Sequence, residues 1–207
     1  MTTAKVREPQ LVLATANPHK LTELTRILEA SRVEVCLGSL AAFPGAPEVV
    51  ETGATFTENA LLKAHAIADF TGLPAVADDS GLCVDALNGM PGVLSARWCG
   101  RHGDDTANLN LVLGQLADVP DERRGAQFAC VAALVLPGGR EHVSEGALTG
   151  SLIREPRGRN GFGYDPIFVP GGDDRTTAEM DAAEKDAISH RGKALRGLAP
   201  VIAALLG

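Results

Sequence analysis

The chain has 207 residues, of which 45% are hydrophobic and only 4% aromatic, and its formal net charge is −7. This length and composition suit one large domain, or two small lobes, around an aliphatic core. The acidic balance argues against a protein that grips a DNA or RNA polymer, since such proteins usually carry a basic face. A pocket for one nucleotide needs only a few cations and stays possible.

The cysteines and the N-terminus bear on the compartment. The cysteines form no CxxC pair and have no histidine at zinc-finger spacing, which favours reduced thiols: they are Cys36, Cys83, Cys99 and Cys130. Residues 1–10 lack the apolar segment of a secretory signal. The longest apolar runs fall short of the roughly 20 residues that span a bilayer. We therefore expect a soluble, cytoplasmic protein with no membrane partner.

The first half of the chain alternates strands and helices. Strands are predicted at 11–14, 33–37, 74–78 and 82–85, with a Ser-Gly kink between the last two. One helix begins at Asn17-Pro18. A second begins at the capping-box pattern Thr55-x-x-Glu58 and stops at Gly72.

The second half adds a hairpin. A helix is predicted at 104–116, paired strands at 126–136 and 141–148 around Pro-Gly-Gly, a basic glycine-rich loop at 154–163, a short strand at 167–169, and a last helix from Ser189. Alternation followed by a hairpin favours an α/β fold with a mixed sheet and flanking helices. No linker marks a boundary, so residues 1–207 are expected to form one domain.

Residues 15–20 (TANPHK) follow a strand and open a helix. A helix N-terminus attracts phosphate through its unpaired N–H groups and its dipole, and Lys20 adds a full charge. The spacing is not that of a Walker A loop. Taken alone, these residues favour the simpler alternative, in which Asn17 only caps the helix and Lys20 lies in solvent.

Two acidic segments come next. Glu51 precedes the second helix, and Lys63 lies within it among apolar residues. Lys63 is either a phosphate ligand or a lysine whose stem covers apolar surface. Asp78 and Asp79 end an apolar strand and are followed by Ser80-Gly81, a common setting for metal and phosphate chemistry. Turn-forming aspartates are the alternative; we favour function and choose Asp79, next to the predicted turn.

Two further segments suit a nucleoside. In 161–166 (GFGYDP) the glycines flanking Phe162 allow its ring to stack on a base, and Asp165 could accept from a ring N–H or a sugar hydroxyl. A turn with two core aromatics is equally compatible. Near the C-terminus, His190 and Arg191 lie in the first turn of the last helix, where cations oppose the dipole, which suggests a bound anion or acceptor-rich base. Surface charge at a frayed end is the alternative.

Together these segments resemble the inosine/xanthosine triphosphate pyrophosphatase family. The matching residues are TANPHK at 15–20, ETGATFTENALLKA at 51–64, ADDSGLCVDALNGMPGVLSARW at 77–98, GFGYDP at 161–166 and EKDAISHRGKAL at 184–195. The resemblance implies an elongated mixed sheet with flanking helices, two lobes around a central cleft, and a homodimer.

The resemblance also implies roles for single residues. It assigns Mg²⁺ to Glu51 and Asp79, with Asp79 as proton acceptor and Ser80 in contact with substrate. The triphosphate would be held by Thr15, Ala16, Asn17, Pro18, His19, Lys20 and Lys63. The nucleoside would be contacted by Phe162, Gly163, Tyr164, Asp165, Lys185, His190 and Arg191.

The implied reaction converts a non-standard purine triphosphate, such as ITP, dITP or XTP, and water into the monophosphate and pyrophosphate. Donors at Lys185, His190 and Arg191 would favour the O6 acceptor of hypoxanthine or xanthine over the amino group of adenine. Two alternatives stay open: an enzyme that releases orthophosphate or transfers a phosphoryl group, and a nucleotide sensor without catalysis.

Overall fold

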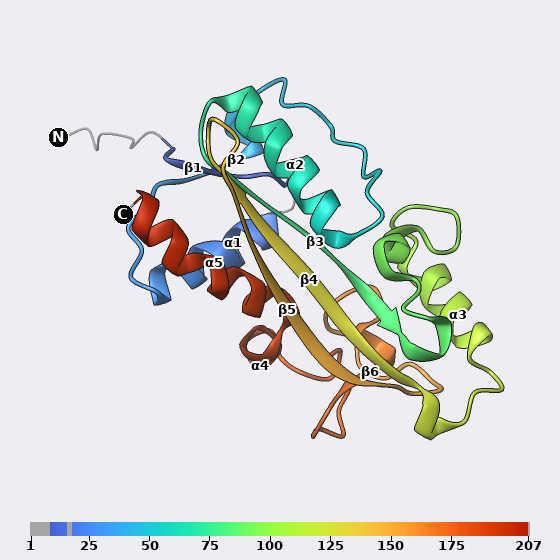
Figure 1. The fold of residues 1–207 in the computed structure, drawn as a ribbon. Helices are drawn as coiled ribbons and strands as arrows, with labels where there is room; N and C mark the ends of the chain where they lie inside the picture. The colour runs from blue at the N-terminus through green and yellow to red at the C-terminus, as the bar shows by residue number, and fades with distance from the viewer. Residues whose placement is uncertain (1–8, 16–17, 207) are drawn as a thin grey trace. The chain divides into compact units, whose positions relative to one another are not determined.

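The computed structural model describes residues 9–15 and 18–206, which form an α/β fold (Figure 1). The strands are β1 (Leu11–Leu13), β2 (Leu37–Ser39), β3 (Ala75–Val84), β4 (Gly125–Val135), β5 (Glu141–Leu152) and β6 (Phe168–Pro170). The α-helices are α1 (Pro18–Ala30), α2 (Phe56–Thr71), α3 (Asp105–Gln115), α4 (Ala182–Ile188) and α5 (His190–Leu206).

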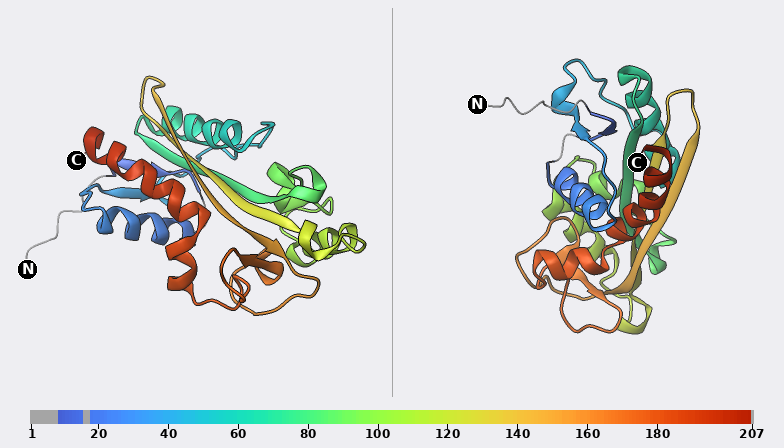
Figure 2. Two further views of the ribbon diagram at one scale, coloured as in Figure 1. Left: turned by 60° about the horizontal axis from the view of Figure 1, so that its bottom comes forward. Right: turned by 90° about the vertical axis from the view of Figure 1, so that its left-hand side faces the viewer.

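The strands form one mixed sheet, as the sequence predicts. Their order is β2-β1-β3-β4-β5-β6. Strand β1 pairs in parallel with β2 and β3, whereas β5 pairs antiparallel with β6. The long strands β4 and β5 lie side by side in every view and form the predicted hairpin (Figures 1 and 2).

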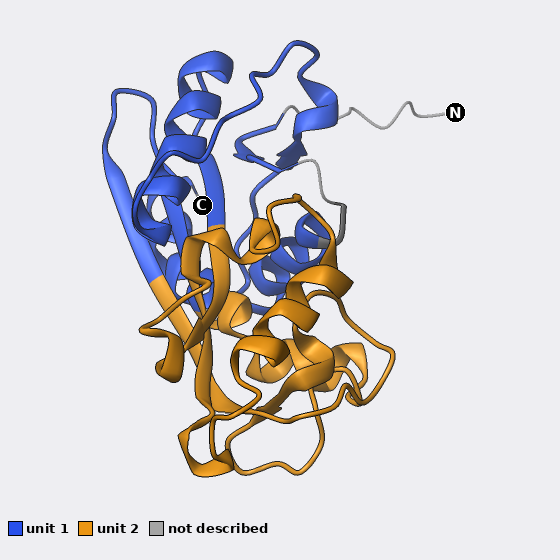
Figure 3. Ribbon diagram, turned by 90° about the vertical axis from the view of Figure 1, so that its right-hand side faces the viewer, with its two compact units in different colours: residues 1–78, 131–144, 194–207 blue, residues 79–130, 145–193 orange. Residues whose placement is uncertain are grey.

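The chain divides into two compact units (Figure 3). Unit 1 comprises residues 1–78, 131–144 and 194–207, and unit 2 comprises 79–130 and 145–193. The boundary cuts through β3, β4, β5 and α5, so each of these elements contributes residues to both units.

Unit 1 has an alanine-rich core. The buried face of α2 carries Ala60, Ala64, Ile67 and Ala68, which pack on Val12, Ala75, Ala77, Val131, Ala133 and Val135 of the strands. Small side chains let the helix approach the sheet closely. The predicted helix limits are confirmed: the Thr55 hydroxyl accepts from the Glu58 N–H at 3.1 Å, and Gly72 ends the helix in the left-handed conformation.

In the core of unit 2, α3 and the loop before β6 pack against the strands. Its buried residues are Leu82, Val84, Leu109, Val112, Leu116, Ala126, Phe128, Leu148, Leu152, Tyr164, Ile167 and Phe168. Arg124 is fully buried, and its guanidinium donates to the carbonyls of Leu116, Leu152 and Ile153. Burial, with the nearby positive charge of Arg154, lowers the pKa of Arg124.

The kink predicted at Ser80-Gly81 is wrong. Strand β3 runs without a break from Ala75 to Val84, so Asp78 and Asp79 lie within it and not at its end. A glycine is required at position 81 for a different reason. A Cβ at Gly81 would lie 2.3 Å from the Gly92 carbonyl oxygen and 2.4 Å from the Ser95 hydroxyl. Gly81 therefore makes room for the 3₁₀ segment Gly92–Arg97 to pack on the strand.

Two other elements differ from the prediction. The strand expected at 33–37 begins only at Leu37, while Val33 is buried in the connection from α1. Helix α4 was not predicted, although it opens with a capping box in which Asp181 and Glu184 bond each other's backbone N–H. Among the described residues, no helix has both the length and the apolar content that crossing a membrane requires.

Candidate active site

The predicted site residues fall into two groups, one in each unit. In unit 1 the first contact joins α1 to β3: Lys20 Nζ lies 2.8 Å from Asp78 Oδ2. The Asp78 side chain is 3% exposed and the Lys20 side chain 22%. A buried carboxylate needs such a partner, because burial without one would penalise its charge. The ammonium of Lys20 is thus fixed near the start of α1.

The second contact of unit 1 joins Lys63 of α2 to Glu51, with Nζ 2.6 Å from Oε1. The segment after Glu51 is held to α2, because the Gly53 N–H donates to the buried Asn59 side chain at 2.8 Å. Glu58 Oε2 accepts from the Ala54 N–H, so Glu58 acts as a cap partner. Lys63 is therefore engaged by an acidic residue and not merely spread over apolar surface.

The donor chemistry of Glu51 and Asp79 fits a hard divalent cation. Mg²⁺ prefers oxygen ligands and is commonly bound by one or two carboxylates together with substrate phosphates. Within residues 9–15 and 18–206, no three or more His, Cys, Asp or Glu side chains are grouped to hold a metal ion. Glu51 belongs to unit 1 and Asp79 to unit 2, and each supplies carboxylate oxygens of the type that Mg²⁺ prefers.

In unit 2, strand β3 continues with Asp79, which is 9% exposed, and Ser80. Arg191 of α5 donates from Nη2 to Ser80 Oγ at 3.2 Å. His190 stacks on Phe128, with ring centroids 5.0 Å apart and an interplanar angle of 14°. Ser189 caps α5 by accepting the Gly192 N–H at 2.9 Å, as predicted. These contacts fix the first turn of α5 beside Ser80.

The buried Asp165 is the centre of the 161–165 segment. Its Oδ1 accepts from the Thr177 hydroxyl at 2.8 Å, and its Oδ2 accepts from the Phe162 N–H at 2.9 Å and from Lys185 Nζ. Asp165 itself is only 3% exposed. Both carboxylate oxygens are thus used within the protein. The side chain organises the segment and orients Lys185.

Phe162 is 63% exposed, and Lys185 Nζ lies 5.0 Å from the centroid of its ring. Gly161 makes this arrangement possible. It has φ +74°, and a Cβ there would lie 2.1 Å from Asp165 Oδ2 and 3.1 Å from Lys185 Nζ. The segment therefore presents an aromatic ring with a cation over one face. Both features suit a planar, acceptor-rich ligand.

Two contacts that were not predicted from the sequence join this segment to other parts of unit 2. The Gly163 N–H donates to Asp105 Oδ2 at 2.8 Å, and the Tyr164 hydroxyl donates to the Ser95 carbonyl at 2.8 Å. Tyr164 is buried, and burial, followed by the negative charge of Asp105, raises its pKa. Asp105 and Ser95 lie more than 50 positions away in sequence, and no local pattern signals either contact.

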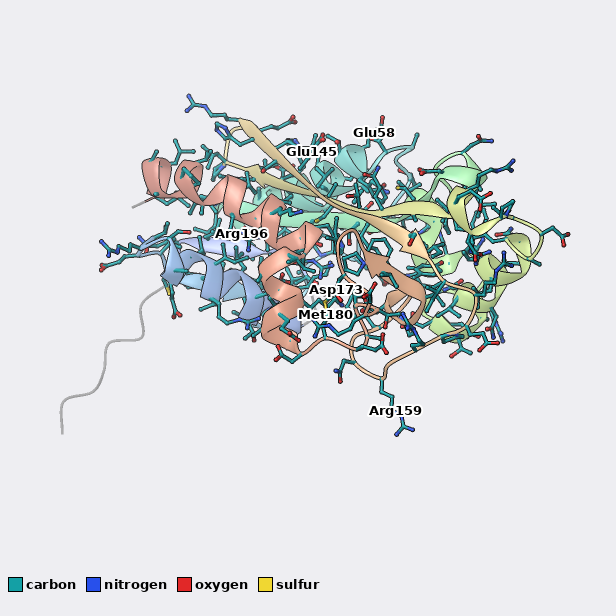
Figure 4. All side chains as sticks on the ribbon, turned by 90° about the horizontal axis from the view of Figure 1, so that it is seen from below. Glu58, Glu145, Arg159, Asp173, Met180 and Arg196 are labelled. Atoms are coloured by element: carbon teal, nitrogen blue, oxygen red, sulfur yellow. The ribbon has the colours of Figure 1, made fainter. Side chains whose placement is uncertain are left out.

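Thr15 follows β1, and Pro18 and His19 begin α1. Ala16 and Asn17 lie outside the described residues, so the predicted cap at Asn17 stays a prediction. In the basic loop that leads to Gly161, Arg159 extends into solvent (Figure 4).

Comparisons with known proteins place this chain among nucleotide pyrophosphatases. A sequence model of the Ham1 family matches residues 11–201. A dITP/XTP pyrophosphatase of Streptomyces coelicolor is 62% identical over 198 residues, which are 96% of this chain and 99% of the relative. A dITP/XTP pyrophosphatase of Mycobacterium tuberculosis is 56% identical over 197 residues, 95% and 96% of the two chains.

Solved structures agree in fold. The nucleoside-triphosphatase / dITP/XTP pyrophosphatase of Mycobacterium abscessus has a TM-score of 0.78 and 59% identity, covering 93% of this chain and 98% of its own. A HAM1 protein from Coxiella burnetii has a TM-score of 0.87 and 44% identity, covering 94% and 98%. The α/β fold with a mixed sheet and flanking helices, predicted from the sequence, is confirmed.

Proposed function

Because the chain belongs to the Ham1 family, we propose that it hydrolyses non-standard purine nucleoside triphosphates (ITP, dITP and XTP) to the monophosphate and pyrophosphate. The observation that carries the proposal is 62% identity to a dITP/XTP pyrophosphatase over 96% of this chain. The contacts within each unit support it. Unit 1 presents cations beside carboxylates, and unit 2 presents an exposed aromatic ring beside cationic donors.

The proposed roles follow the chemistry of each group. Lys20, Lys63 and the 15–20 segment, including Ala16, Asn17, Pro18 and His19, bind the triphosphate. In unit 1, Lys63 is paired with Glu51 and Lys20 with Asp78. When the substrate arrives, its phosphates take the place of Glu51 as partner of Lys63. Glu51 then becomes available to a cation that accompanies the phosphates.

Pyrophosphatases of this family usually use a divalent metal ion. We propose Mg²⁺, with Glu51 and Asp79 as its protein ligands. When bound, Mg²⁺ neutralises phosphate charge and lowers the pKa of a water. Asp79 is the proposed catalytic carboxylate, where it holds the metal or accepts the proton of the water that attacks the α-phosphorus. The bond to the β-phosphate oxygen breaks, and pyrophosphate leaves.

Selectivity is proposed to come from unit 2. The base stacks on the face of the Phe162 ring opposite Lys185 Nζ. Lys185, His190 and Arg191 donate toward the O6 acceptor of hypoxanthine or xanthine, where adenine has a donor of its own. Because a donor that faces another donor is costly, this set rejects ATP. Ser80 joins the site through Arg191, and the buried Tyr164 and Asp165 contribute through the main chain and by orienting Lys185.

We further propose, from the family, that residues 1–207 act as one domain with two lobes, that the active form is a homodimer, and that it removes non-standard triphosphates from the cytoplasmic pool. Size-exclusion chromatography with light scattering tests the dimer. The proposed substrate is a single nucleotide and not a nucleic acid polymer.

The decisive experiment is a product assay on a panel of triphosphates with Mg²⁺. ITP, dITP and XTP are compared with ATP and GTP, and pyrophosphate and orthophosphate are measured separately. We expect pyrophosphate and monophosphate from the non-standard substrates, and far slower turnover of ATP. Direct release of orthophosphate would indicate β–γ cleavage. Tight nucleotide binding without any product would indicate a sensor.

A further inference from the structure

The exposed Phe162 ring has to be held by its backbone. It is 63% exposed, and the cation of Lys185, 5.0 Å from the ring centroid, covers one face. Few packing contacts can restrain a side chain this exposed. Its orientation therefore depends on how firmly residues 161–165 are fixed.

The backbone of this segment is anchored on two sides. On one side, Asp165 accepts the Phe162 N–H through its side chain, and its own N–H donates to the Phe162 carbonyl at 3.2 Å. On the other side, the Gly163 N–H donates to Asp105 Oδ2 at 2.8 Å. The first anchor belongs to the segment itself. The second anchor, the contact with Asp105, joins the segment to helix α3.

Asp105 lies on helix α3, which is held firmly within unit 2. It lies in the first turn of α3, whose N-cap Asp104 accepts the Ala107 N–H at 3.0 Å. The same helix is fixed by Leu109 and Val112, which are buried in the core of unit 2. The raised pKa of Tyr164, to which the charge of Asp105 contributes, agrees with a carboxylate close to this segment.

We propose that Asp105 is a positioning residue of the nucleobase site: its carboxylate holds the Gly163 N–H and so keeps the Phe162 ring oriented to stack on the base. This role rests on the proposed function. This role requires only a hydrogen-bond acceptor at position 105, because the Gly163 N–H donates to a single carboxylate oxygen. A hydrogen bond donated to a charged acceptor at an exposed site contributes modestly to substrate binding and to stability.

The kinetic test compares Asp105→Ala with Asp105→Asn. The Asn variant keeps an acceptor oxygen but loses the charge that favours a helix N-terminus. We expect Asp105→Ala to raise KM for ITP about three- to tenfold with kcat little changed, and Asp105→Asn to restore most of the loss. Equal effects of the two variants would assign Asp105 to the stability of α3 and overturn the proposal.

A double-mutant cycle with Phe162→Ala tests the route of the effect. If Asp105 acts through the Phe162 ring, Asp105→Ala should raise KM for ITP little further in a protein that already carries Phe162→Ala. Fully additive changes in KM would overturn the proposal. Asp121→Ala is the matched control, because Asp121 also makes an exposed contact, an ion pair with Arg154 at 2.8 Å, outside the proposed site.

A measurement without turnover separates this proposal from the proposed function. Hydrogen–deuterium exchange of the peptide covering residues 160–166 is compared in wild type, Asp105→Ala and Asp105→Asn. We expect faster exchange only in the Ala variant, whether or not the protein is active. Unchanged exchange would refute the anchor. Absence of pyrophosphate from wild-type protein with every triphosphate would instead refute the proposed function.

Discussion

Asp78 and Lys20 form a partly buried ion pair, with Oδ2 and Nζ 2.8 Å apart. This pair distinguishes two carboxylates that are adjacent in sequence. Asp78 holds a lysine of the neighbouring helix in place, while Asp79, the next residue of β3, is the one proposed for catalysis. Neighbouring residues of a strand point to opposite faces, so the two carboxylates serve different sides of β3.

Substitution of the two aspartates should therefore have different effects. We expect Asp79→Asn to reduce kcat by roughly 10²-fold or more with little change in the melting temperature. Asp78→Asn should lower the free energy of unfolding by about 1–3 kcal/mol and raise KM while turnover persists. Thermal unfolding and ITP kinetics of both variants check this. Near-normal turnover of Asp79→Asn would remove that residue from the mechanism.

Glu51 is expected to govern the metal requirement. Glu51→Gln should raise the Mg²⁺ concentration for half-maximal activity by about tenfold or more, since a neutral amide replaces a charged oxygen ligand. Chelation by EDTA should abolish wild-type activity reversibly. Glu48→Gln is the matched control, because Glu48 is an exposed residue of the same loop. An unchanged Mg²⁺ dependence of Glu51→Gln would argue against Glu51 as a ligand.

The donors of α5 are expected to set selectivity. His190→Ala or Arg191→Ala should raise KM for ITP about fivefold or more and narrow the ratio of kcat/KM between ITP and ATP. The exposed Arg123 supplies the control variant Arg123→Ala. If the ratio is the same as wild type in both α5 variants, the donor explanation is wrong.

Gly161 is expected to tolerate no side chain. In Gly161→Ala the Cβ would collide with Asp165 Oδ2, so Lys185 should lose its orientation. We expect a rise in KM for ITP and a loss of about 1–3 kcal/mol of stability. Gly172→Ala is the control: its φ of +86° is also positive, but nothing lies within 4 Å of the added Cβ. Equal losses in both variants would show backbone strain alone.

Tyr164, the only tyrosine, offers a direct optical test of its environment. Because its folded-state pKa is raised, the neutral phenol contributes stability that is complete below the unfolded-state pKa of about 10 and is lost as pH rises above it. Phenolate absorbance should therefore appear near pH 10 in denaturant, but only at higher pH, or together with unfolding, in native protein. A native midpoint near 10 without unfolding would contradict the burial of the hydroxyl.

Local signals in the sequence were enough for most elements. The cap at Thr55 and the stop at Gly72 define α2, because capping depends on residues within one helical turn. The same kind of signal is present at Asp181 and Glu184, where the capping box opens α4, a helix that was not predicted. The break at Ser80-Gly81 was wrong for a reason outside the strand. Position 81 needs a residue without a side chain because Ser95 packs against it, and no pattern around residue 81 reveals that contact.

The sequence by itself determined the alternation of strands and helices, the helix caps and the order of the five motifs, because all of these depend on near neighbours along the chain. Only the tertiary structure decided the partners: Lys20 with Asp78, Lys63 with Glu51, and Asp105 with the Gly163 N–H. A buried or anchored polar group needs a partner, but many residues of suitable chemistry compete for that place. Which of them lies within hydrogen-bonding distance is settled by the packing of helices on strands.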